Sequence, residues 1–148
     1  MRTRRLVLAA AAVTTAALTT AATAAASSPA QGFRAQQPYL ITFEVGDGKD
    51  RYSVRTSDPQ TLARAQELLT SAPAQGPAVP HGKIIAEPSP DNPGYDWHIS
   101  PAGFHFADVG AISCDAVPQM VFPGTEVWQF GYYCPWSAKV AEIEPVSP

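Results

Sequence analysis

The sequence predicts a small α+β domain, in which a mainly antiparallel sheet carries one packed α-helix and one disulfide. Three observations support this fold class: several short segments alternate apolar and polar residues, a single segment has helical periodicity, and the chain holds two cysteines. The expected elements run strand, strand, helix and then further strands, with no internal repeat. We therefore expect one domain, over residues 39–145.

Residues 1–26 have the features of a secretory signal peptide. A basic start at 1–5 precedes an uncharged run at 6–26, and its small final residues fit cleavage after Ala26. A membrane anchor is the competing interpretation, because the run is about long enough to span a bilayer. Its many alanines and threonines make it only weakly hydrophobic. We therefore expect a secreted, extracellular protein with a flexible lead-in at 27–38.

The charge of the mature chain disfavours some partners. Removing 1–26 takes away three of the ten basic residues and none of the thirteen acidic ones, which leaves a net charge of −6. Nucleic acids and anionic membranes are bound through basic faces. No later segment is apolar enough to cross a bilayer. We expect neither nucleic acid nor, after signal cleavage, a membrane as a partner.

Two alternating segments at the start of the domain predict a β-hairpin. Ile41, Phe43 and Val45 share one face of 39–45 with Tyr39, and Tyr52 and Val54 share one face of 51–55. The Gly-Asp-Gly between the two segments is a turn signal. The apolar face of this hairpin is expected to be buried.

One helix follows the hairpin. Asp58 is a good N-cap, Pro59 suits the first helical position and Pro73 ends the helix. The apolar stripe of the helix, at spacings of three, four and three, consists of Leu62, Ala65, Leu69 and Ala72. This stripe is expected to cover a face of the sheet.

The C-terminal half predicts further strands at 82–87, 95–99, 127–133 and 139–143. Between them, Phe104 and Phe106 point to one side and His105 to the other. Segment 109–118 fits either a strand or a short helix, and the topology of 109–126 stays open.

Cys114 and Cys134 are expected to form a disulfide, because an exported protein meets an oxidising environment. Such a bridge closes a loop of about 20 residues and contributes about 3 kcal/mol in the chain-entropy model. A metal site or a catalytic thiol is the alternative, but no second cysteine pair completes a zinc site.

The proline-rich segment 88–94 predicts a rigid surface loop, since three prolines fix the backbone and remove hydrogen-bond donors. A pre-ordered tip contacts a partner at little entropic cost. Two polar residues follow on one face of the next strand. The candidate partner-binding residues are therefore Asp91, Asn92, Pro93, Gly94, Asp96 and His98.

An enzymatic alternative uses His98 with Asp96 or Asp108, since a carboxylate orients an imidazole and raises its basicity. No serine lies in a G-x-S-x-G motif, so no catalytic residue is assigned. The acids and histidines also lack the spacing of a metal site, so no metal or other cofactor is expected. The residues considered for a metal are His81, Asp96, His98, His105 and Asp108.

The three tryptophans, Trp97, Trp128 and Trp136, suggest a carbohydrate-binding module as another alternative. Such a module needs two or more of them exposed in a line, so that sugars can stack on the rings. Core filling is the competing interpretation for Trp97 and Trp136.

A joint pattern in the C-terminal half resembles a known family. The pattern comprises Asn92-Pro93-Gly94-Tyr95, Trp97-His98, Pro101, Phe106-Ala107-Asp108, Cys114-Asp115 and Tyr133-Cys134-Pro135-Trp136-Ser137. It is similar to the N-terminal domain of a slime-mould calmodulin-binding protein and to many small secreted bacterial proteins, over about Phe43 to Val140. The resemblance implies an autonomous α+β domain with a Cys114–Cys134 bridge, and it supplies no catalytic residues.

Calmodulin itself is not an expected partner. Its targets are normally basic amphipathic helices. The predicted helix, 59–71, holds one basic residue, Arg64, and one acidic residue, Glu67. The chain also departs from the family at 117–124, where prolines interrupt the longer helix that the resemblance implies.

These observations together favour a small secreted, non-enzymatic binding module, with an extracellular protein or glycan as its partner. A protease-inhibitor-like role, in which 88–94 is presented to a partner, is one concrete version. The small hydrolase and the carbohydrate-binding module remain the alternatives.

Overall fold

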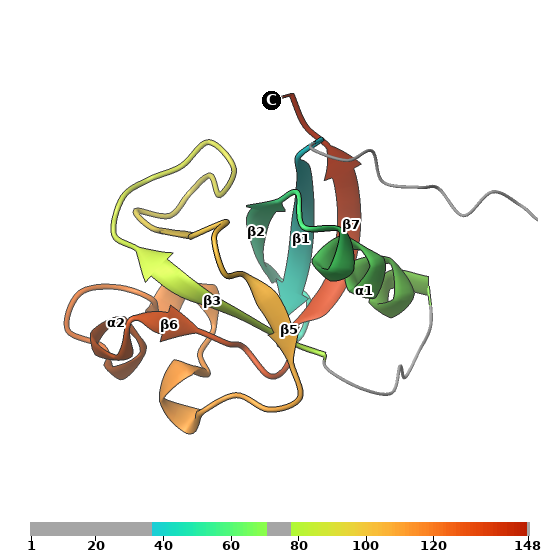
Figure 1. The fold of residues 1–148 in the computed structure, drawn as a ribbon. Coiled ribbons are helices and arrows are strands. Elements are labelled where there is room, and N and C mark those ends of the chain that lie inside the picture. Colours follow the sequence, from blue (N-terminus) through green and yellow to red (C-terminus); the bar gives the residue numbers. More distant parts are fainter. Residues whose placement is uncertain (1–36, 71–77, 148) are drawn as a thin grey trace, which may run out of the picture. The chain divides into compact units, whose positions relative to one another are not determined.

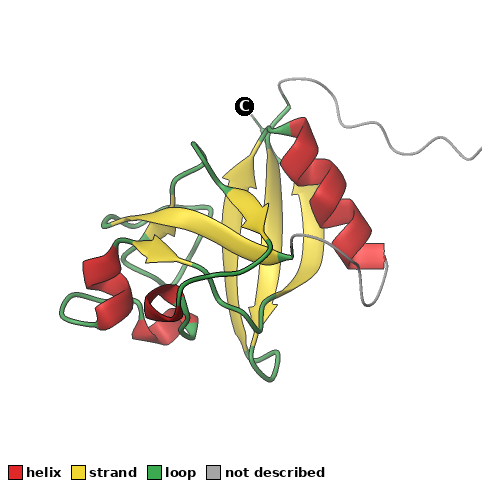
Figure 2. Cartoon of the chain, turned by 60° about the horizontal axis from the view of Figure 1, so that its bottom comes forward, coloured by secondary structure: helices red, strands yellow, loops and turns green. Residues whose placement is uncertain are grey.

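The predicted apolar faces meet in a core between two antiparallel sheets (Figure 1, Figure 2). The computed structural model describes residues 37–70 and 78–147, which belong to one compact unit, Gln31–Pro148. The expected signal peptide at 1–26 and most of the lead-in at 27–38 lie outside the described residues, as does Ala72.

The first sheet has the order β2-β1-β7. β1 (Tyr39–Val45) and β2 (Asp50–Thr56) form the predicted hairpin, and the residues predicted to face inward from position 41 onward are buried. The turn uses Gly46 and Gly48, both with positive φ, a conformation that glycine adopts without strain. β7 (Lys139–Pro145) pairs with the other side of β1, so the end of the domain lies beside its start.

The helix α1 (Pro59–Thr70) begins where the sequence predicts. The Thr61 backbone N–H donates to Asp58 Oδ2 at 2.7 Å, which confirms Asp58 as the N-terminal cap. Leu62 and Ala65 are buried, and the helix contacts β7 and β5. Leu69, in the last turn, is 38% exposed, and Leu68 packs against the core in its place.

The second sheet is built on β3 (Val79–Ile85), which crosses the strands of the first sheet (Figure 2). β3 starts three residues earlier than predicted and pairs in turn with β5 (His105–Ala107), β6 (Tyr132–Tyr133) and β4 (His98–Ile99). Its central Gly82 allows close contact, since a Cβ there would lie 2.3 Å from Ile99 Cγ2. Where the sequence predicts one sheet, the described strands therefore form two.

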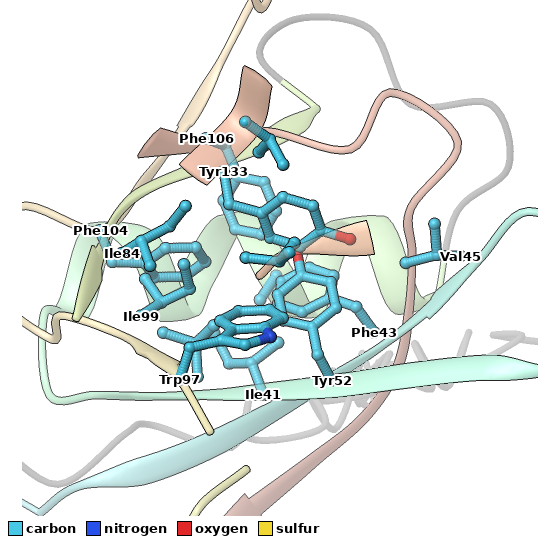
Figure 3. Close-up of a cluster of buried hydrophobic side chains, with 14 of the residues drawn as sticks. Ile41, Phe43, Val45, Tyr52, Ile84, Trp97, Ile99, Phe104, Phe106 and Tyr133 are labelled. Atoms are coloured by element: carbon cyan, nitrogen blue, oxygen red, sulfur yellow. The ribbon is translucent and has the colours of Figure 1, made fainter. Parts of the chain in front are cut away.

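Aromatic rings from both sheets fill the space between them (Figure 3). Phe43 lies 6.0 Å from Phe104 between ring centroids, and Tyr52 lies 5.1 Å from Tyr133. Trp97 is 2% exposed and packs edge-on to Tyr133 at 5.2 Å. The alternation in the sequence predicted the inward side of these strands correctly.

The prediction of a strand over 127–133 is wrong for most of its length. Residues Glu126–Phe130 form a short helix, α2, and only Tyr132–Tyr133 pair as β6. Gly131 ends the helix in the left-handed conformation, and its N–H donates to the carbonyls of Val127 and Trp128. Two 3₁₀ turns, Ile112–Cys114 and Pro118–Met120, settle the region that the sequence left open.

Candidate functional site

The predicted rigid loop 88–94 lies against the outer edge of β2, the last strand of the first sheet. Asp91 accepts two hydrogen bonds from Arg55 of β2, from Nε at 2.7 Å and from Nη2 at 2.8 Å. Such a paired contact fixes both the position and the orientation of the carboxylate. The loop is therefore held by side chains as well as by its prolines.

Asn92 corrects the expectation of an exposed loop tip, because it is 1% exposed. Its Oδ1 accepts the backbone N–H of Ser53 at 3.1 Å, and its Nδ2 donates to the carbonyl of Trp97 at 3.0 Å. An edge strand has backbone groups without a strand partner. Asn92 satisfies one of them, so its inward orientation has a structural reason. Pro93 and Gly94 are exposed as predicted.

The Arg55–Asp91 pair makes stability depend on pH. The hydrogen bond from Arg55 lowers the pKa of the Asp91 carboxyl, partly offset by burial, and the charges of Arg55 and His98 add to the lowering. A carboxyl whose pKa is lower in the folded state stabilises the fold above its unfolded pKa, and this contribution is lost as the pH falls through the folded value.

We expect Asp91→Asn to lower the free energy of unfolding by about 1 kcal/mol at pH 7. The difference from the wild type should shrink at pH 3, where the carboxyl takes up a proton. Urea unfolding at the two pH values measures both quantities. An equal difference at pH 7 and pH 3 would show that the ion pair is not its source.

The geometry gives little support to a hydrolase built on His98. Its Nδ1 lies 2.9 Å from the carbonyl oxygen of Glu87, and His105 Nδ1 lies 2.8 Å from that of Gly103. Within residues 37–70 and 78–147, neither imidazole hydrogen-bonds to a serine or a carboxylate. The same residues contain no group of three or more metal-ligating side chains.

A cleft of about 500 Å³ opens beside the loop. One wall comes from the segment after the loop and the other from the segment between the second 3₁₀ turn and α2. It includes Gly94 and Asp96 from the predicted partner-binding set, whereas His98 does not line it. The lining residues are Ala86, Gly94, Tyr95, Asp96, Trp97, Pro118, Gln119, Val121, Phe122, Pro123 and Trp128.

The cleft combines aromatic walls with negative charge. Asp96 is exposed and lines it, and no lysine or arginine does. Burial raises the pKa of the Tyr95 phenol, and the nearby charge of Asp50 raises it further. Gln119 donates from its Nε2 to Asp50, so a second carboxylate lies close to the rim. Such a surface favours an apolar or cationic ligand over an anionic one.

The tryptophans occupy three different environments. Trp97 is buried, and its indole Nε1 has no hydrogen-bond partner among the described residues. Trp128 is partly buried and lines the cleft, whereas Trp136 is 51% exposed beside Val109 and Gly110 in a separate cavity of about 460 Å³. They do not form the exposed line that a carbohydrate-binding module needs.

The disulfide between Cys114 and Cys134 is present, with both residues buried and their Cα atoms 5.1 Å apart. The backbone N–H of Cys134 also donates to the carbonyl of Cys114 at 2.8 Å. The bridged segment contains one wall of the cleft, including Phe122 and Trp128. The disulfide thus fixes the ends of a segment that has little regular structure.

Sequence reasoning missed this wall. Phe122 and Gln119 lie in the segment whose topology was open, and Trp128 lies in the misassigned strand. Glycine at 131, directly after the last helical residue, is the signal that could have indicated a helix end.

These features define a small, disulfide-bonded α+β domain with two antiparallel sheets and an aromatic cleft at its surface. None of the helices in the described part of the chain is long and apolar enough to cross a membrane. The chain belongs to the family of the N-terminal domain of the slime-mould calmodulin-binding protein, and the model of this family matches residues 38–147. The resemblance seen in the sequence is thereby confirmed. No curated protein and no solved structure matches the chain.

Proposed function

We propose that the chain is a small secreted, non-enzymatic binding module, which holds a segment of an extracellular protein in the aromatic cleft. The observation that carries this proposal is the cleft itself, whose walls present Tyr95, Phe122 and Trp128 beside the exposed carboxylate of Asp96. Protein-binding pockets are enriched in such aromatic side chains. A catalytic histidine set is not assembled around it.

The cleft supports this function better than the loop alone does. A protease-inhibitor-like loop presents its side chains outward, whereas Asn92 points inward and Asp91 is paired with Arg55. The outward residues, Pro93 and Gly94, adjoin the cleft, and Gly94 lines it. We therefore assign the loop a supporting role, as the fixed border of the binding surface.

Phe122→Ser tests this assignment. Phe122 is 50% exposed, so its replacement removes ring contacts in the cleft without opening the core. We expect the amount of partner retained from culture medium by the immobilised domain to fall at least about fivefold, as for an aromatic residue central to an interface. The matched control is Phe130→Ser, since Phe130 is 45% exposed and does not line the cleft. Equal retention by the two variants would contradict the assignment.

Export is the other part of the proposal, and it makes a separate prediction. Signal cleavage after Ala26 gives a mature protein that begins at Ser27. N-terminal sequencing of the protein recovered from the medium measures this directly. Recovery only from the cell fraction, with Met1 or residues near it retained, would reject export.

A further inference from the structure

We infer that the cleft binds a cationic side chain, an arginine or a lysine, of the partner segment. This inference rests on the proposed function and deepens it by naming the chemical group that enters the cleft. It follows from the arrangement of the aromatic rings, from the charges around them and from the pairing of the cations elsewhere in the domain.

The rings of the cleft suit a cation. Tyr95 and Trp97 lie 5.3 Å apart between ring centroids and are inclined by 44°, so together they form an angled wall. Phe122 and Trp128 belong to the lining as well. A guanidinium or ammonium group is attracted to the face of an aromatic ring, and a guanidinium also stacks on it.

The charges point the same way. Within residues 37–70 and 78–147, Asp96 takes part in no ion pair and no side-chain hydrogen bond. Four of the cations in the described part of the chain, by contrast, already pair with carboxylates: Lys49, Arg51, Arg55 and Arg64. The cleft therefore offers the carboxylate of Asp96 to a positive charge supplied from outside.

A library of phage-displayed twelve-residue peptides tests the inference on the mature domain. Peptides are selected on the wild type and retained only if Phe122→Ser, but not Phe130→Ser, abolishes their binding. We expect arginine or lysine to be enriched in this set. In a synthetic arginine peptide, replacing arginine by its neutral isostere citrulline should raise Kd about tenfold.

The variant Asp96→Asn completes a cycle with the two peptides. It should weaken the arginine peptide about three- to tenfold and leave the citrulline peptide unchanged. Asp108→Asn is the control, because Asp108 is an exposed aspartate that lines a separate cavity. Near-ultraviolet circular dichroism verifies that each variant is folded.

The outcomes separate this inference from the function on which it rests. Cleft-dependent peptides without a basic residue, or equal affinities for arginine and citrulline, overturn the cation site and leave the binding module in place. A library that yields no cleft-dependent peptide overturns both.

Discussion

Replacing Asn92 with alanine is expected to lower the free energy of unfolding by about 2–4 kcal/mol, because two buried backbone groups lose their partners. The Ser53 N–H loses its acceptor at 3.1 Å, and the Trp97 carbonyl loses its donor at 3.0 Å. Asn92 is 1% exposed, so water does not readily replace either bond. Urea unfolding followed by tryptophan fluorescence measures the change.

Asn92→Asp serves as a matched comparison. An aspartate keeps an oxygen that accepts from Ser53, but it has no N–H to donate to the Trp97 carbonyl. It should therefore be destabilising as well, while binding of the loop to the β2 edge is better preserved than in the alanine variant. A loss below about 0.5 kcal/mol for Asn92→Ala, the range of ordinary surface substitutions, would show that the loop is not anchored by this side chain.

The second large effect is expected from removal of the disulfide. The double variant Cys114→Ser, Cys134→Ser should lose about 3 kcal/mol, since the bridge closes a loop of about 20 residues. That loop carries Phe122 and Trp128 of the cleft. We expect binding to the partner to weaken even under conditions in which the variant is still folded, because the wall that these residues form is no longer held at both ends.

Thermal unfolding and partner retention, measured on the same samples, separate the two consequences. A lower Tm with wild-type retention would mean that the cleft wall is held by the core alone. An unchanged Tm would show that the bridge does not stabilise the fold.

The alternation of residues allowed the core to be predicted, because period-two patterning reports which side of a strand is buried. Phe43, Tyr52, Trp97 and Phe106 all lie where this pattern places them. The division into two sheets was not predictable in the same way. It depends on which strands pair with β3, and those pairings connect residues far apart in the chain.

The candidate site was harder to predict, for two physical reasons. The rigidity of the loop follows from its own prolines, but the burial of Asn92 depends on Ser53, 39 residues away. The second wall of the cleft has valine, tryptophan and phenylalanine in α2, which favour strands, yet Gly131 ends a helix there. Local composition indicated one structure and the end signal another.

The tryptophan indole N–H signals in a nuclear magnetic resonance spectrum test the central claim most directly, since the three rings lie in the core, in the cleft and beside the disulfide. On titration with the retained partner or with a cleft-dependent peptide, we predict that the Trp128 signal moves in proportion to binding and that the Trp136 signal stays in place. Movement of Trp136 alone would place the binding surface elsewhere and contradict the account.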